Sequence, residues 1–116
     1  MTTHQHIDYD ALNALKDIMD DNFVFLIDTF IQDSTERLIQ LQTLVNAGDV
    51  NGDAIRRAAH SFKGSCSNIG APYLAGLCSK VETNVLNSEF GNLPVDVIVI
   101  QQEFLLVKTL LVEYLG

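Results

Sequence analysis

One short stretch of this sequence carries side chains whose types and spacing could do chemistry. His60 is followed one helical turn later by Lys63, with Gly64 directly after it. A neutral imidazole has a nucleophilic nitrogen, and with an unperturbed pKa of about 6.5 most histidines are neutral slightly above pH 7. Phosphoryl transfer depends mainly on positioning and charge neutralisation, which a nearby lysine can supply. The pattern predicts a histidine that takes up a phosphoryl group.

Gly64 lies inside an expected helix, where glycine costs about 1 kcal/mol relative to alanine. The surrounding helix is rich in alanine, so a glycine at this position needs a reason. Close approach of a second protein to the backbone beside His60 would be such a reason. We expect that protein to supply the groups that donate and accept the phosphoryl group, together with any Mg²⁺, and we expect no cofactor on this chain.

Positive charge is concentrated beside His60 in an otherwise acidic chain. Seven Lys and Arg stand against 15 Asp and Glu, which gives a net charge of −8. Three of the seven basic residues, Arg56, Arg57 and Lys63, fall close together in the sequence. This local patch suits docking onto an acidic pocket of a partner. The overall acidity argues against nucleic acid and anionic membranes as partners.

A helix must hold these residues, and the apolar spacing predicts helices along the whole chain. The run Val-Ile-Val-Ile at residues 97–100 has strand propensity, but it continues into a helical pattern without a turn signal. Four long helices with short connections favour an all-α fold, an antiparallel up-down-up-down four-helix bundle with an additional short N-terminal helix. The expected helices cover residues 8–20, 22–47, 51–68, 72–87 and 94–115.

The length of 116 residues predicts one domain with a single core. Residues 1–7 are expected to be a disordered or frayed tail, and residues 8–116 to form the bundle. Cys66 and Cys78 are too few for a disulfide scaffold, and no spacing of His, Cys or carboxylates indicates a metal site. The expectation is a cytoplasmic monomer without a membrane span.

The segment around His60 resembles the histidine-containing phosphotransfer (HPt) domain, in particular its small free-standing bacterial members. The resemblance covers residues 60–71, His-Ser-Phe-Lys-Gly-Ser-Cys-Ser-Asn-Ile-Gly-Ala, with Leu74, Leu77, Cys78 and Glu82 beyond them. The family pattern is His-x-x-Lys-Gly, a run of small residues and then Gly-Ala. Three positions, Phe62, Cys66 and Ser67, depart from the residues commoner in the family.

The resemblance implies a carrier without turnover of its own, not an enzyme. It would move a phosphoryl group between aspartates of two receiver domains, one in a hybrid sensor kinase and one in a response regulator. His60 would be the phospho-acceptor, Lys63 the charge partner and Gly64 the clearance for the receiver. An acidic residue on the next helix orients the histidine in some relatives, and Glu82 falls where that residue is expected. The expected partner-binding residues are Arg56, Arg57 and Ser67.

Other functions remain open on the sequence. The same helices would suit an interaction module that binds a response regulator without transfer, or a phosphate sink. A carboxylate-bridged metal bundle would need Glu-x-x-His pairs on two helices, and the sequence has none. An ordinary surface carboxylate is an equally good interpretation of Glu82. Leu15 and Ile18 are candidates for an apolar docking patch.

Overall fold

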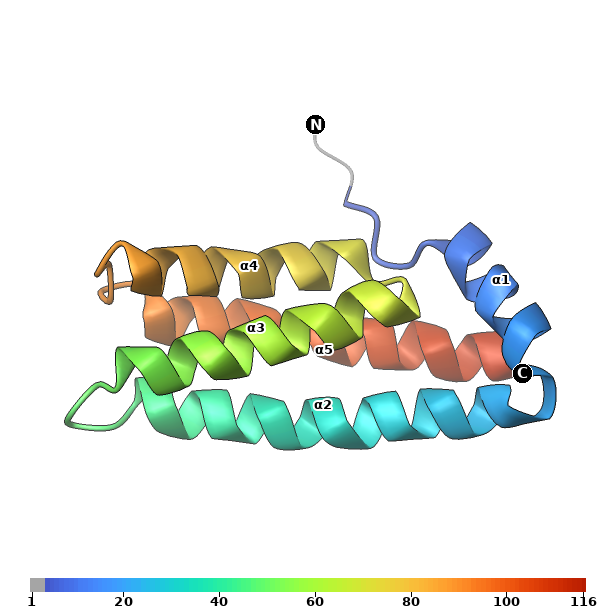
Figure 1. The fold of residues 1–116 in the computed structure, drawn as a ribbon, viewed down its shortest axis with the longest axis horizontal. Helices are drawn as coiled ribbons and strands as arrows, with labels where there is room; N and C mark the ends of the chain where they lie inside the picture. The colour runs from blue at the N-terminus through green and yellow to red at the C-terminus, as the bar shows by residue number, and fades with distance from the viewer. Residues whose placement is uncertain (1–3) are drawn as a thin grey trace.

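The structure is a computed structural model that describes residues 4–116, and its secondary structure over that range is helical (Figure 1). The Val-Ile-Val-Ile run lies inside a helix, as the sequence predicts, and its first and last residues, Val97 and Ile100, belong to the buried stripe of that helix. The expected all-α class is therefore confirmed. The elements are α1 (Tyr9–Met19), a short 3₁₀ turn (Asp20–Asn22), α2 (Phe23–Val45), α3 (Gly52–Ile69), α4 (Pro72–Leu86) and α5 (Leu93–Leu115).

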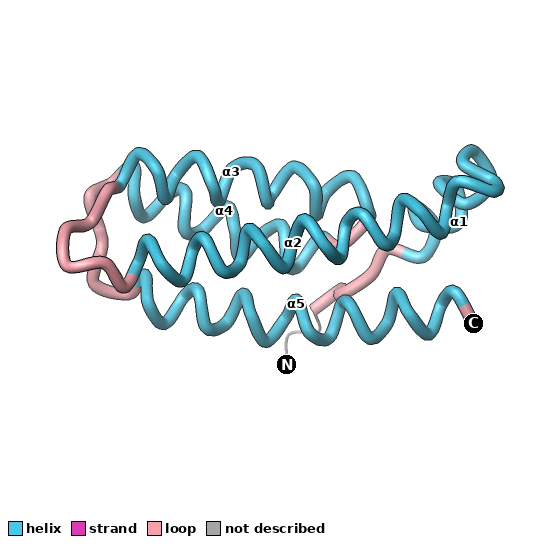
Figure 2. Tube along the Cα trace, turned by 90° about the horizontal axis from the view of Figure 1, so that it is seen from below, coloured by secondary structure: helices cyan, strands magenta, loops and turns pink. Residues whose placement is uncertain are grey.

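The four long helices run alternately in opposite directions and form a ring (Figures 1 and 2). In this ring α2 contacts α3, α3 contacts α4, α4 contacts α5, and α5 returns to α2. Helices α3 and α5 therefore lie diagonally opposite each other. The short helix α1 lies across the end of the bundle where α2 begins and α3 ends. The predicted up-down-up-down bundle with an additional N-terminal helix is confirmed.

The packing of α3 decides which of its side chains meet solvent. Apolar residues at a helical spacing form one buried stripe that faces the core. Phe62, in the middle of that stripe, is fully buried and lies edge-on to Phe104 of α5, with ring centroids 6.4 Å apart. The opposite face of α3, which includes His60, is exposed. The buried residues of α3 are Ile55, Ala58, Ala59, Phe62, Cys66 and Ile69.

A tight turn joins α3 to α4 and fixes how these two helices pair. Gly70 ends α3 with φ of +86°, in the left-handed region that favours glycine. A side chain at this position would also meet the carbonyl oxygen of Asp8 at 3.3 Å. Pro72 then occupies the first turn of α4, where a missing N–H is tolerated.

The N-terminal segment differs from the sequence prediction. Residues 1–3 lie outside the described residues, but the expectation of a frayed tail is wrong for residues 4–7, which lie against the bundle. Ile7 is buried in the core, and His6 Nδ1 lies 2.7 Å from Oε2 of the buried Glu103 on α5. These contacts join positions far apart in the chain, so a local reading of the sequence does not reveal them.

Main-chain hydrogen bonds tie the same segment to the turn between α3 and α4. The N–H of Asp8 donates to the carbonyl of Gly70 at 2.8 Å, and the N–H of Tyr73 donates to the carbonyl of Gln5 at 3.2 Å. The Asp8 side chain also accepts from the N–H of Ala11 and caps α1. The segment therefore braces the end of the bundle at which α3 passes into α4.

We predict that His6→Ala destabilises the fold. Among the described residues His6 is the group that pairs with the buried Glu103 carboxylate. Loss of that pairing should lower the free energy of unfolding by about 1–3 kcal/mol, as measured by urea denaturation. Adding Glu103→Gln to this variant should recover part of the loss, because an amide is less costly to bury than a carboxylate. A His6→Ala variant as stable as the parent would contradict the assignment.

Candidate functional site

The site is centred on His60, near the middle of α3. Its side chain is 64% exposed, because it projects from the face of α3 opposite the buried stripe. The neighbouring residue Ala59 is fully buried, so the helix itself is firmly seated beneath the imidazole. The result is an exposed ring on a rigid support.

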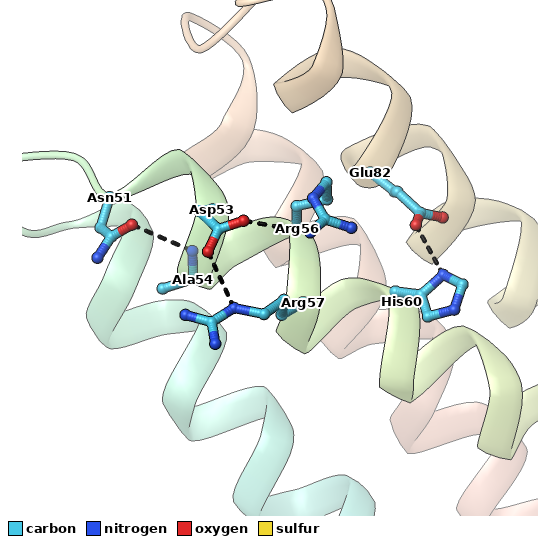
Figure 3. A network of polar contacts seen from close by, with 7 residues as sticks. All are labelled: Asn51, Asp53, Ala54, Arg56, Arg57, His60 and Glu82. Carbon is cyan, nitrogen blue, oxygen red and sulfur yellow. Dashed lines mark hydrogen bonds and ion pairs between the residues drawn. The ribbon is translucent and has the colours of Figure 1, made fainter.

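Glu82 of α4 joins His60 to Lys63 through its two carboxylate oxygens. His60 Nδ1 lies 2.7 Å from Glu82 Oε2, and Lys63 Nζ donates to Glu82 Oε1 at 2.8 Å. Figure 3 shows the imidazole and the carboxylate facing each other across the gap between α3 and α4. The Glu82 side chain is 13% exposed, so the carboxylate is largely enclosed by the two helices and its partners.

The charge of Glu82 determines the proton position on His60. The hydrogen bond from Lys63 is the largest influence on the Glu82 carboxyl and lowers its pKa; partial burial opposes this, and the hydrogen bond with His60 lowers the pKa further. The net pKa lies below the ordinary value of 4.5, so Glu82 is ionised at neutral pH. An ionised carboxylate can only accept, so Nδ1 of His60 carries the hydrogen. In the neutral ring the lone pair is then on Nε2, the nitrogen that Glu82 does not engage.

Small buried residues bring α3 and α4 close enough for this bridge. Cys66 and Cys78 meet between the two helices and are both fully buried. A hydrogen bond with Cys78, together with burial, raises the pKa of the Cys66 thiol, so this thiol stays neutral. The two cysteines are packing residues of the α3–α4 interface.

Gly64 is exposed one turn after His60, and nothing in the fold requires a glycine there. A β-carbon added at this position would meet no heavy atom within 4 Å. Its backbone is helical and not in the left-handed region that glycine favours. The space above Gly64 is open, as the predicted clearance for a partner requires.

The other predicted partner-binding residues lie along α3 but outside the carboxylate bridge. Arg56 Nη2 and Arg57 Nε each lie 3.1 Å from an oxygen of Asp53, on the N-terminal side of His60 (Figure 3). Ser67 is exposed on the C-terminal side of His60. The structure therefore brings together only the histidine, the lysine and the glutamate of the predicted set, and spreads the remaining residues along one helix.

Two features beside the site could not be read from the sequence. Arg37 of α2 and Arg57 line one shallow hollow between α2 and α3, which adds a second helix to the basic patch. An apolar groove also runs between α1, α2 and α3, with Leu15 on its wall. Ile18 is 78% exposed on α1 but does not line the groove. The apolar groove residues that were not predicted from the sequence are Met19, Leu26, Phe30 and Ile69.

Two further properties apply to the described part of the chain. None of the helices within residues 4–116 combines the length and apolar character that crossing a membrane requires. Over the same residues, no group of three or more His, Cys, Asp or Glu side chains is arranged to hold a metal ion.

The chain matches the model of the Hpt domain family over residues 26–113. It is also similar to the crystal structure of histidine-containing phosphotransfer protein B (HptB) from Pseudomonas aeruginosa PAO1. The two chains are 38% identical and superpose with a TM-score of 0.90, which covers 97% of this chain and 96% of HptB. No curated protein matches the sequence.

More distant structures share the fold. MtHPt2 of Medicago truncatula is 24% identical, with a TM-score of 0.83 over 95% of this chain and 76% of its own. Ypd1 of Saccharomyces cerevisiae, crystallised with the receiver domain of its downstream response regulator Ssk1, is 17% identical, with a TM-score of 0.68 over 94% of this chain and 89% of its own. The family match over most of the length and the likeness to HptB confirm the resemblance seen around His60: this chain belongs to the histidine-containing phosphotransfer (Hpt) domain family.

Proposed function

We propose that this domain is a phosphorelay carrier of two-component signalling, which accepts a phosphoryl group on Nε2 of His60. The observation that carries the proposal is the exposed imidazole whose Nδ1 is engaged by Glu82 at 2.7 Å. This contact fixes the ring and leaves the other nitrogen open to a partner. A histidine that served only packing would be enclosed rather than presented in this way.

The transfer is a displacement at phosphorus. The Nε2 lone pair forms the N–P bond as the P–O bond to a receiver aspartate breaks, and the bonding electrons leave with the aspartate carboxylate. The ring gains positive charge during this step, and the ionised Glu82 beside Nδ1 stabilises that charge. Transfer to a second receiver aspartate reverses the same exchange, so the carrier is regenerated and has no turnover of its own.

Lys63 has a second role in this proposal. With His60 unphosphorylated, its ammonium group is held by Glu82 at 2.8 Å, and its side chain is 32% exposed. A flexible lysine in this position can turn toward phosphoryl oxygens on Nε2, which lie one helical turn away. Glu82 would thus hold the cation ready beside the ring until a phosphoryl group arrives.

The proposed partners are the receiver domains of a hybrid sensor kinase and of a response regulator. The support is the family membership, the receiver domain bound to Ypd1, and the surface beside His60, which combines open space at Gly64 with the apolar groove. Mg²⁺ would belong to the receiver and no cofactor to this chain. One copy of the chain suffices for the chemistry, and the proposal places the carrier in the cytoplasm with its receivers.

The direct test is transfer of radiolabelled phosphate from a phosphorylated receiver domain. The wild-type domain should become labelled and pass the label to a second receiver, His60→Gln should stay unlabelled, and His4→Gln should behave like wild type as the matched control. Label that persists in His60→Gln would refute the assignment of the acceptor. Binding without label would indicate an interaction module, and label that is lost without reaching the second receiver would indicate a phosphate sink.

We predict opposite effects on stability and transfer at Gly64. Gly64→Ala should raise the free energy of unfolding by up to about 1 kcal/mol, because alanine is the better helix former and its β-carbon meets nothing. Gly64→Gln should slow transfer from a phosphorylated receiver at least about tenfold, because the glutamine side chain occupies the space that the partner needs. This corresponds to an activation barrier raised by roughly 1.4 kcal/mol. Circular dichroism should show unchanged helix content.

Gly76 of α4 offers a matched control. It is also an exposed helical glycine with nothing within 4 Å of an added β-carbon. It precedes Glu82 by six residues, a rotation of about 240° around α4, so it points away from the site. Gly76→Gln should leave the transfer rate unchanged. Equal slowing by both glutamine variants, or by neither, would show that Gly64 provides no special clearance.

A further inference from the structure

Helix α5 presents apolar side chains on all sides, although only its inner side packs against the bundle. A helix that is hydrophobic all round is normally buried all round. The outward face of α5 nevertheless exposes four aliphatic side chains by more than half of their surface. These residues are Val95 (59%), Ile98 (53%), Leu105 (53%) and Val112 (53%).

The exposed residues have the spacing of a helix-pairing seam. Together with Gln102 and Thr109 they follow alternating steps of three and four, at positions 95, 98, 102, 105, 109 and 112. This is the a/d pattern by which two helices pack side by side, with Ile98, Leu105 and Val112 at the d positions. We call these six residues the outer stripe of α5.

The outer stripe carries no charge, although the chain has a net charge of −8. Between residues 97 and 107 the one charged residue of α5 is Glu103, which is buried against His6. Leu106, beside the stripe, is also partly exposed and widens it. Several exposed aliphatic side chains on one face of a folded domain are typical of an interaction site.

The outer stripe lies apart from the phosphotransfer site. Helix α5 is diagonally opposite α3 in the ring (Figures 1 and 2), so the outward faces of these two helices point to opposite sides of the bundle. His60 belongs to the exposed face of α3. A receiver docked over His60 would leave α5 uncovered. The stripe therefore fits a partner other than the receiver.

We propose that the outer stripe binds the same stripe of a second copy of this chain, with the two α5 helices parallel. The argument for a second copy is charge complementarity at the edges of the seam. Lys108 lies at a g position and Glu113, five residues later, at the e position of the following heptad. In a parallel pair these positions face each other across the seam, so two symmetric Lys108–Glu113 pairs form.

The antiparallel alternative lacks this match. In an antiparallel pair the g positions face g positions and the e positions face e positions. Lys108 would then meet another g residue, and none of the g residues, at positions 94, 101 and 108, is acidic. Both Lys108 and Glu113 are exposed, and neither makes an ion pair with another residue in the range 4–116. They are thus available to a second copy.

The proposed dimer is weak, which differs from the monomer expected from the sequence. A few side chains per copy form a smaller contact than the roughly 800 Å² per partner of a standard interface. We therefore expect a dissociation constant between about 10 μM and 1 mM. Dimer formation through α5 leaves both His60 side chains facing outward, so each copy keeps its own access to receivers.

Sedimentation equilibrium of the full chain over this concentration range tests the proposal. The wild type should pass from monomer to dimer, and Leu105→Glu should weaken association at least about tenfold. The matched control is Leu86→Glu, a change at an exposed leucine of α4 (67%) outside the stripe, which should dimerise like wild type. Wild type that stays monomeric up to about 1 mM, or Leu105→Glu that dimerises normally, would overturn the proposal. Leu105→Glu should still accept phosphate on His60, which keeps this test independent of the proposed function.

Two further variants test the orientation. Gln102 faces its own counterpart only in the parallel pair, so Gln102→Cys should form a disulfide-linked dimer under mild oxidation. Thr43→Cys, exposed on α2, should not, and the native Cys66 and Cys78 are fully buried. The single change Lys108→Glu should weaken association, and adding Glu113→Lys should restore it. Association without the Gln102→Cys crosslink and without this rescue would overturn the parallel arrangement.

Discussion

The carboxylate of Glu82 is the interaction on which the site depends. One oxygen meets Nδ1 of His60 at 2.7 Å and the other accepts from Lys63 at 2.8 Å. The same group therefore fixes the tautomer and orientation of the imidazole and restrains the cation beside it. The hydrogen bond from Lys63 lowers the pKa of Glu82, so the carboxylate is charged at neutral pH. Without this bridge, His60 would be an ordinary exposed histidine with a free choice of tautomer.

The bundle supports the bridge by holding α3 and α4 at a fixed register. The left-handed turn at Gly70 reverses the chain within a few residues, and Pro72 starts the next helix at once. Small residues at the α3–α4 contact, such as Cys66 and Cys78, let the helices approach closely, since interaxial distance follows the size of the side chains at the contact. The N-terminal segment then braces this turn. An error of one residue in the register would rotate Glu82 by about 100° away from the ring.

Most of the helices could be predicted from the sequence because a stripe of buried residues repeats with helical spacing. The end of α3 at Gly70 and the start of α4 at Pro72 could also be predicted locally, because glycine often ends a helix and proline is tolerated in its first turn. The role of His60 was predicted from its spacing to Lys63 and from the family resemblance, whereas the role of Glu82 came from the resemblance alone. The structure supplies the distance between the two side chains. The structure also shows that Lys63 pairs with Glu82, which no local sequence pattern predicts.

What escaped prediction depends on contacts between distant positions. The segment at residues 4–7 has the composition of a frayed end, yet it lies against the bundle. One of its partners is Glu103, almost a hundred residues away in the chain, and the other is the α3–α4 turn, which is dozens of residues away. The hollow shared by Arg37 and Arg57 and the groove near Leu15 arise only when α1, α2 and α3 pack together. The outer stripe of α5 could not be predicted from the sequence, because α5 is apolar on all sides and only the structure shows which side the bundle leaves exposed.

The identity of the phosphorylated nitrogen tests the central claim most directly. In this experiment a phosphorylated receiver phosphorylates the domain, which is then isolated. NMR of the nitrogen-labelled protein identifies the ring nitrogen that carries phosphorus. If Glu82 occupies Nδ1, phosphorus should be found on Nε2 of His60. Phosphorus on Nδ1 would contradict the account, because that nitrogen could then not have been held by the carboxylate during transfer.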